Sequence, residues 1–226
     1  MSLNQSPGDP PTEPSFEGLV QLPDVQLFVR RFGATGPDLI IIHGGPDWDH
    51  SYFLPFVLPL ATYMRVTLFD LRGCGRSQKF NDPTCYHLDL AVDDLAHLCQ
   101  QLSLVPATLL GFSYGGRIAL RLADRYPHLV GKLILASTTA YDDFTDELEQ
   151  WDEYRQRNDD QMRASLAALL ASPDLSNEEK TRKMAQLSAP LNIYDLSLLE
   201  QVHEVQNRIA FSGEWMAAWL EGMLKV

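Results

Sequence analysis

The sequence predicts an α/β protein with a mostly parallel β-sheet and a helical cap inserted over it. Two observations carry this prediction. Between residues 38 and 140, short apolar runs alternate with stretches of helical periodicity, which is typical of parallel strands joined by right-handed helical crossovers. After residue 140 the apolar runs stop, and charged, helix-forming sequence takes their place.

Composition limits the class of protein. The 226 residues suffice for one α/β domain with a modest insertion, and 45% of them are hydrophobic. A net charge of −12 argues against nucleic acid or an anionic membrane as a partner, and no apolar run is long enough to span a membrane. The N-terminus lacks an export signal, so we expect a cytoplasmic protein. No metal is expected from the spacing of the three cysteines, Cys74, Cys85 and Cys99.

The strands can be assigned in chain order. Residues 1–15 are rich in proline and polar side chains, and they predict a disordered tail before a core at residues 16–140. Residues 18–32 hold two extended runs around a Pro23-Asp24 turn, which predict an antiparallel hairpin. Four apolar runs then predict parallel strands: residues 38–45, 65–73, 107–113 and 132–137.

Helices are expected between these strands. Residues 52–64 predict a helix interrupted by prolines, and residues 114–126 predict the helix that follows the third parallel strand. Residues 85–104 place apolar side chains along one side of a helix: Leu88, Val92, Leu95, Leu98 and Leu102.

Residues 141–226 predict the helical cap. This segment lacks a convincing strand, and serine, asparagine and proline punctuate it. We expect the cap to lie over the carboxyl ends of the strands, where open α/β sheets bind ligands. Its helical stretches are residues 142–158, 161–171, 176–188 and 212–224.

The segment ATLLGFSYGG contains the candidate nucleophile. Gly111, Ser113 and Gly115 follow the G-x-S-x-G spacing, directly after a strand and directly before a helix. That order predicts a nucleophile elbow, a sharp turn that holds a serine hydroxyl clear of the sheet. The amide of Tyr114, at the start of the helix, would face a developing oxyanion. A chance match in a glycine-rich loop is the alternative interpretation.

A second loop, HGGP at residues 43–46, follows the first parallel strand. We expect its Gly45 amide to be the second oxyanion donor, because a residue without a Cβ lets the backbone approach a substrate carbonyl. His43 is not expected to be the catalytic base. The histidine of such a loop organises the turn, and the partners of the nucleophile follow it in chain order in this architecture.

These motifs resemble the α/β-hydrolase superfamily, and within it the capped hydrolases similar to proline iminopeptidases. The resemblance covers about residues 18–140 and includes DLRGCGRS at residues 70–77. It implies that this third motif is a structural turn, tied by Asp70, Arg72 and Ser77. HGGPDW also resembles a stretch of haloalkane dehalogenases and epoxide hydrolases, but their nucleophile is aspartate, so Ser113 argues against both activities.

The sequence departs from the family pattern at its C-terminal end. The resemblance implies an acid loop and a histidine loop on strands beyond the cap, and the chain reaches Val226 before either. His128 and His203 follow Ser113, but both have helical surroundings, so neither is expected to be the base. We expect these residues to be part of a longer enzyme whose core resumes beyond residue 226. Residues 132–137 would then form an exposed apolar edge.

The leading functional hypothesis is a serine hydrolase that cleaves an ester, amide or peptide bond of a small molecule or short peptide through an acyl-enzyme, without a cofactor. An iminopeptidase would need cap carboxylates to pair with the substrate ammonium. An esterase, lactonase or carbon–carbon bond hydrolase would use an apolar pocket. A ligand-binding protein without catalysis is the hypothesis from another class. The candidate carboxylates are Glu147, Glu149, Asp152, Glu153 and Glu214, and the candidate pocket residues are Trp48, Tyr52, Phe53 and Tyr114. The sequence leaves the oligomeric state open.

Overall fold

The computed structural model describes residues 11–140 and 145–221. Its centre is a six-stranded sheet in the order β1-β2-β4-β3-β5-β6. Strands β3, β4, β5 and β6 are parallel, whereas β2 runs antiparallel to both of its neighbours. The predictions of a mostly parallel sheet and of an N-terminal hairpin are therefore confirmed. The strands are β1 (Phe16–Gln21), β2 (Gln26–Phe32), β3 (Asp38–Ile42), β4 (Arg65–Phe69), β5 (Ala107–Phe112) and β6 (Val130–Ala136).

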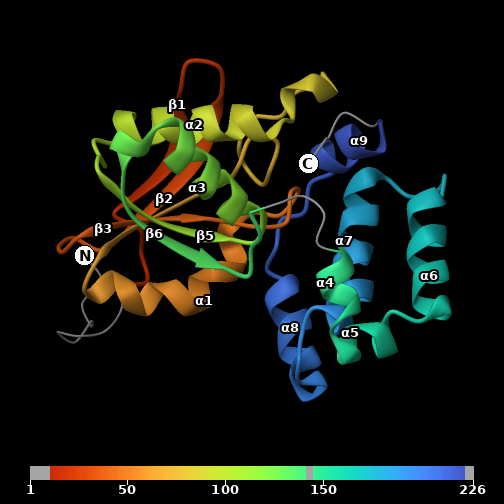
Figure 1. Ribbon diagram of the computed structural model, residues 1–226. Helices are drawn as coiled ribbons and strands as arrows, with labels where there is room; N and C mark the ends of the chain where they lie inside the picture. The colour runs from red at the N-terminus through yellow and green to blue at the C-terminus, as the bar shows by residue number, and fades with distance from the viewer. Residues whose placement is uncertain (1–10, 141–144, 222–226) are drawn as a thin grey trace.

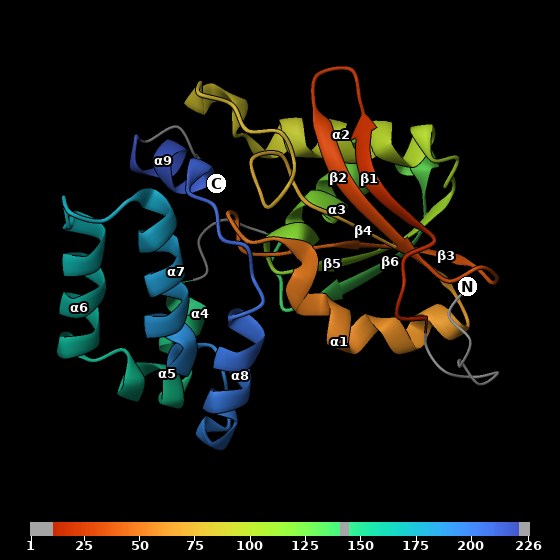
Figure 2. The same ribbon diagram turned by 180° about the vertical axis from the view of Figure 1, so that it is seen from behind.

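Helices cover both faces of the sheet. Helices α2 (Leu88–Gln101) and α3 (Tyr114–Arg125) lie on one face, and α1 (Leu54–Val57) lies on the other (Figures 1 and 2). Alternate side chains of β3 enter the two resulting cores. Ile40 packs with α2 and α3, whereas Ile41 packs with the α1 side. This period of two explains why the strand reads as a continuous apolar run.

Proline divides the helix expected at residues 52–64. The structure has three short pieces there, a 3₁₀ turn at His50–Phe53, α1, and a second 3₁₀ turn at Leu58–Thr62. Pro55 and Pro59 each lie in the first turn of a piece. A proline has no N–H to donate and is tolerated in a first turn, so each one starts a new piece.

The apolar side predicted for residues 85–104 faces the core. Val92, Leu95 and Leu98 are fully buried in α2, and Leu88 and Leu102 pack against the same cluster. The remaining short 3₁₀ turns are Pro83–Cys85, Pro127–Leu129, Ala189–Leu191 and Leu196–Leu198.

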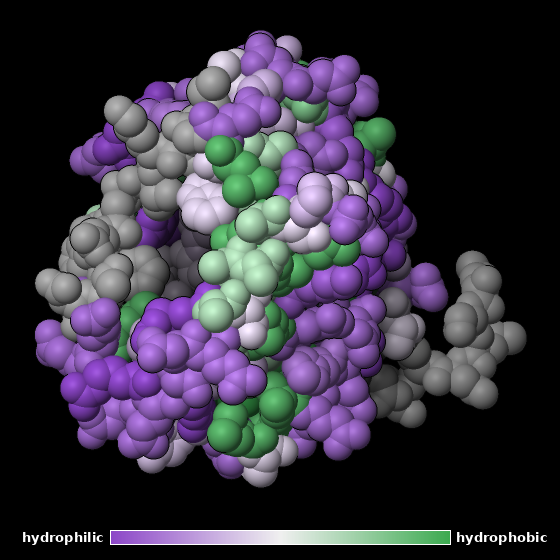
Figure 3. Space-filling model, turned by 90° about the vertical axis from the view of Figure 1, so that its right-hand side faces the viewer, coloured by the Kyte–Doolittle hydropathy of each residue, from purple (hydrophilic) through white to green (hydrophobic). Residues whose placement is uncertain are grey.

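The segment after residue 144 is helical, and helices α4 to α8 form a layer beside the sheet (Figure 1). The outer face of this layer is mainly hydrophilic, with apolar side chains confined to a band (Figure 3). Within the described residues, no helix has the length and apolarity that a membrane crossing requires. The helices are α4 (Thr145–Glu149), α5 (Asp152–Arg157), α6 (Asp160–Ala171), α7 (Asn177–Ser188), α8 (Leu199–Gln206) and α9 (Glu214–Leu220).

Helix α9 packs against the core, although it belongs to the segment predicted as cap. Trp215 is 1% exposed and lies in the same apolar cluster as α2 and α3. Its indole Nε1 donates a hydrogen bond to the Arg72 carbonyl oxygen at 2.7 Å. Its ring also contacts the rings of Tyr86 and Tyr114. The chain therefore returns from the helical layer to the sheet before residue 221.

The two ends of the predicted core are an exposed edge strand and the start of the N-terminal hairpin. Strand β6 is an edge of the sheet as the structure describes it, and its Ile134 and Leu135 are 46% and 42% exposed. This is the apolar edge expected for residues 132–137. At the N-terminus, residues 1–10 of the predicted tail lie outside the described residues, whereas Ser15 already donates its N–H to the Arg31 carbonyl oxygen at 2.7 Å. Ordered pairing thus begins just before residue 16.

Replacing Trp215 by alanine tests the packing of α9 on the core. We expect Trp215→Ala to lower the free energy of unfolding by about 3–5 kcal/mol, because a large buried side chain is removed and a cavity remains. Trp219→Ala, on the same helix but 45% exposed, should cost less than about 1 kcal/mol. Urea unfolding of both variants gives the comparison. Equal losses would show that α9 does not depend on Trp215 for its position.

Candidate active site

Ser113 occupies a strained turn between β5 and α3. Its φ is 51° and its ψ is −120°, a conformation that residues other than glycine rarely adopt. Hydrogen bonds hold the turn on both sides. The Ser113 N–H donates to the Ala136 carbonyl oxygen at 2.9 Å, and the Thr138 hydroxyl donates to the Ser113 carbonyl oxygen at 2.7 Å. The geometry is that of the predicted nucleophile elbow.

The flanking glycines are required because backbone segments pass very close to one another. A Cβ on Gly111 would lie 2.6 Å from the Gly116 Cα, and a Cβ on Gly115 would lie 2.2 Å from the Ile42 carbonyl oxygen. Both distances are shorter than a Cβ can tolerate. The first turn of α3 therefore packs directly on the end of β3, and this contact brings the two motif loops together.

The HGGPDW loop, residues 43–48, lies against Ser113. A Cβ added to Gly44 would be 2.7 Å from the Ser113 Cβ, and Gly45 has a φ of +61°. The Gly44 N–H donates to the Tyr52 hydroxyl oxygen at 2.8 Å. Within residues 11–140 and 145–221, no acceptor takes the Gly45 N–H. Gly45 is thus the glycine of this loop that can offer an amide to a ligand.

His43 organises this loop. The Leu71 N–H donates to its Nε2 at 2.9 Å, so the proton of the neutral ring belongs on Nδ1, which lies 3.0 Å from the Gly44 carbonyl oxygen. Burial lowers the pKa of His43 and favours this neutral form. Both ring nitrogens are occupied, which agrees with the expectation that His43 is not the catalytic base.

The DLRG turn is also structural. The Ser77 hydroxyl donates to the Asp70 carbonyl oxygen at 2.6 Å, and Arg72 binds both carboxylate oxygens of Asp94 at 2.7 Å. Burial acts to raise the pKa of Asp70, but the hydrogen bond from His50 and the other donors hold it below its ordinary value. Asp70, Arg72 and Ser77 therefore tie the turn, as the resemblance implies.

One buried cluster has the residue types of a metal site. Ligand atoms of Asp49, His50 and Asp70 lie within 4.8 Å of one another. These groups already bind one another and the chain: the His50 Nδ1 lies 2.5 Å from an Asp70 oxygen, and Asp49 accepts from Ser51 and from the Ala210 N–H. The cluster therefore connects loops through the two carboxylates and the His50 Nδ1, whereas the buried His50 Nε2 has no hydrogen-bond partner among the described residues.

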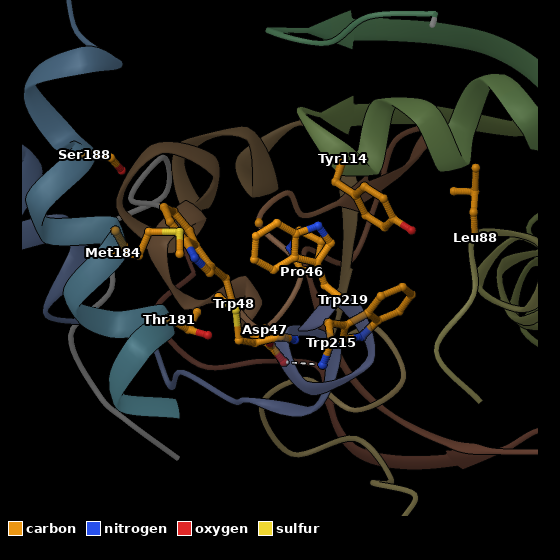
Figure 4. A pocket seen from close by; sticks show the side chains of 13 residues that line it. Pro46, Asp47, Trp48, Leu88, Tyr114, Thr181, Met184, Ser188, Trp215 and Trp219 are labelled. Carbon is orange, nitrogen blue, oxygen red and sulfur yellow. Dashed lines mark hydrogen bonds between the residues drawn. The ribbon is translucent and has the colours of Figure 1, made fainter. Parts of the chain in front are cut away.

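Two cavities meet at the HGGPDW loop, and Gly45 and Trp48 line both. The first, which we call the tryptophan cavity, has a volume of about 340 Å³. The second, the α8 cavity, has a volume of about 560 Å³ and includes Ser113 in its wall. Other walls of the tryptophan cavity are formed by Leu88, Tyr114, Met184, Trp215, Met216 and Trp219 (Figure 4). Those of the α8 cavity include Tyr52, Phe112, Asn192, Gln201, Val205 and Gln206.

The structure brings Ser113, Gly45 and Tyr114 together at these cavities, with Tyr114 as the first residue of α3. Phe53 packs on Tyr52 and Phe112, behind the cavity wall. Sequence reasoning missed the walls supplied by α7, α8 and α9. The tryptophans of α9 gave the one signal, since large aromatic side chains in a charged segment need a surface to pack on.

The two histidines that follow Ser113 in the sequence do not line either cavity. His128 is exposed in the turn before β6, at the opposite end of the parallel strands from the elbow. His203 lies on α8 but not among the residues that line the α8 cavity. Among the described residues, no histidine lines either cavity.

Asp47 connects the HGGPDW loop to α9. Its two carboxylate oxygens accept from the N–H groups of Trp215 and Met216, at 3.0 and 2.7 Å, and Figure 4 shows the first of these bonds. The side chain is 1% exposed. Burial raises the pKa of Asp47 to about 6, although the two backbone donors act to lower it.

The elbow, the neighbouring glycine loop and the parallel sheet together define a hydrolase architecture. A family model described as alpha/beta hydrolase fold matches residues 37–201. The chain belongs to the alpha/beta hydrolase family.

Curated relatives of the chain include proline iminopeptidases. One from Saccharolobus solfataricus is 31% identical over 125 residues, a match that covers 54% of this chain and 40% of that protein. Another from Levilactobacillus brevis is 40% identical over 102 residues, which cover 44% of this chain and 34% of the relative. The matches thus span less than half the length of these relatives. A thermophilic esterase from Thermogutta terrifontis is similar in structure, with a TM-score of 0.65 and 25% identity, over 93% of this chain and 73% of the esterase.

The raised pKa of Asp47 predicts a pH dependence of stability. Between pH 4 and 6 the unfolded chain ionises at Asp47, whose ordinary pKa is 3.8, while the folded chain retains the proton. This group's contribution to stability is therefore present at low pH and is lost as the pH rises through about 6. Relative to Asp47→Asn, the wild type should lose about 3 kcal/mol of unfolding free energy between pH 4 and pH 7. Urea unfolding at a series of pH values measures this loss. Parallel pH profiles of the wild type and Asp47→Asn would contradict a raised pKa of Asp47.

Proposed function

We propose that this chain carries the nucleophile and the oxyanion site of a serine hydrolase that cleaves an ester, amide or peptide bond through an acyl-enzyme. The observation that carries the proposal is the strained conformation of Ser113, held against Gly44 in the wall of the α8 cavity, which Gly45 also lines. Strain of this kind is retained where surrounding structure imposes it, and it concentrates at functional sites.

The chemistry has two steps. The Ser113 Oγ forms a bond to the substrate carbonyl carbon, its proton passes through a general base to the leaving group, and the bond to the leaving group breaks. A water molecule then attacks the acyl-enzyme, gives its proton to the same base, and releases the acid as the Ser113 oxygen recovers a proton.

The oxyanion of each tetrahedral intermediate would accept from the Gly45 and Tyr114 amides. Tyr114 begins α3, so the positive end of the helix dipole lies at this point. Fixed amide donors stabilise the charge that develops in the transition state more than they stabilise the neutral carbonyl.

The general base must come from outside the described residues, since no histidine within them lines either cavity. The same observation favours a second candidate function, a ligand-binding protein that keeps the cavities but not the proton relay. Reaction with a serine-directed probe separates the two candidates. The similarity to proline iminopeptidases and to an esterase supports hydrolysis, and these relatives differ in the bonds that their names imply.

Labelling with a fluorophosphonate tests the nucleophile. The full-length enzyme should be labelled at Ser113, and Ser113→Ala should lose both the label and turnover, with a fall in kcat on the order of 10⁶. Ser137→Ala is the matched control, because Ser137 lines the same cavity and should leave labelling unchanged. Labelling that survives in Ser113→Ala and disappears in Ser137→Ala would overturn the assignment.

Substitution of Gly45 tests the oxyanion loop. A Cβ at this position would lie 2.6 Å from the Trp48 ring, so Gly45→Ala must shift the loop. We expect kcat to fall by about 10² or more, with a smaller change in KM, because the amide acts mainly in the transition state. Steady-state kinetics gives both constants, and the urea midpoint shows whether the fold is intact. A change confined to KM would assign the loop to substrate binding alone.

A further inference from the structure

The two cavities differ in the polarity of their walls. The tryptophan cavity is lined mainly by indole rings, methionine side chains and Leu88 (Figure 4). The α8 cavity adds neutral side-chain amides from Asn192, Gln201 and Gln206 to a wall of aromatic and aliphatic groups. Because Trp48 contributes to both, its ring lies at the boundary between them. A substrate held at Ser113 therefore has an apolar space and a space with neutral hydrogen-bonding groups.

The walls formed by the described residues offer no accessible counter-ion to a charged substrate. Among the described residues that line either cavity, Asp47 is the only one with a formally charged side chain. Both of its carboxylate oxygens accept from backbone N–H groups of α9, and the side chain is only 1% exposed, so a substrate in the cavity has little access to it. The Tyr52 hydroxyl is equally committed to the Gly44 amide, and burial raises the pKa of this phenol well above its ordinary value.

The carboxylates that the sequence offered as partners for a substrate ammonium lie outside the walls of both cavities. Glu214 binds the Lys79 ammonium at 3.0 Å and accepts from the Gly213 N–H at 2.9 Å. Asp152 forms an ion pair with Arg155 on the surface of α5. None of the five candidates lines either cavity: Glu147, Glu149, Asp152, Glu153 and Glu214. An ammonium placed in the tryptophan cavity would lose its hydration without gaining a partner, which costs several kcal/mol.

We propose that this site is selective for uncharged esters with an apolar arm on one side of the reacting carbonyl, held in the tryptophan cavity, and a neutral arm on the other, held in the α8 cavity. The proposal rests on the function proposed for Ser113. It excludes substrates with a free N-terminal amine from efficient turnover. Indole rings and methionine thioethers contact apolar groups of varied shape, so the tryptophan cavity accepts both aromatic and branched aliphatic arms.

A pair of substrates of the same shape tests this selectivity. Proline benzyl ester and cyclopentanecarboxylic acid benzyl ester differ chiefly in the ring ammonium. With the full-length enzyme at pH 7, kcat/KM should be at least about 100-fold higher for the neutral ester, because the site gives the ammonium no partner. Acid release is followed by titration. Equal values, or a higher value for the proline ester, would overturn the proposal.

A matched pair of variants tests the role of the tryptophan cavity. Met184→Glu places a carboxylate in its wall, whereas Gln186→Glu adds the same charge on the exposed side of α7. Met184→Glu should lower the preference for the neutral ester at least about tenfold, and Gln186→Glu should leave it unchanged. The ratio of kcat/KM values does not depend on the fraction of folded enzyme. An unchanged ratio in Met184→Glu would contradict binding in this cavity.

Different experimental results would contradict the proposed nucleophile and the proposed selectivity. If the proline ester is the better substrate and Ser113→Ala abolishes its turnover, the selectivity is wrong and the nucleophile stands. If Ser113→Ala hydrolyses the neutral ester as fast as the wild type, the nucleophile assignment is wrong and the selectivity that rests on it falls with it.

Discussion

The close contact between the first turn of α3 and the end of β3 is the constraint on which the site depends. Ile42 ends β3 and Gly115 lies in α3, and their backbones approach so closely that only a residue without a side chain fits. This contact fixes the direction in which the chain leaves β5, and so it fixes the strained φ of Ser113. It also places the HGGPDW loop, which continues from β3, directly beside the serine.

The HGGPDW loop then connects the site to the rest of the molecule. Toward the core, His43 accepts from the Leu71 amide and so joins the loop to the end of β4. Toward the helical layer, Asp47 binds the first turn of α9, and Trp48 forms part of both cavities. A shift of this loop would therefore change the proposed oxyanion donor Gly45, a helix contact and a cavity wall together. In the proposed function, substrate selectivity and the position of the reacting carbonyl would therefore depend on the same six residues.

Local patterns in the sequence were sufficient for the sheet and for the centre of the site. Short apolar runs predicted the parallel strands, and the carboxyl ends of such strands meet at one edge, so Ser113 and Gly45 could be expected to lie close together. The position of α9 could not be predicted. Its periodicity shows that one side is buried but not which surface covers it, and Asp47, which holds it, lies 168 residues before Trp215. The same holds for the cavity walls from α7 and α8, which depend on long-range packing.

A crystal structure of the full-length enzyme after reaction with a dialkyl fluorophosphate tests the central claim most directly. The account predicts a covalent bond from the Ser113 Oγ to phosphorus, with the phosphoryl oxygen about 2.7–3.1 Å from both the Gly45 and the Tyr114 backbone nitrogens. The alkoxy groups should extend toward the two cavities. A phosphoryl oxygen directed away from these amides, or a bond to a different side chain, would contradict the account.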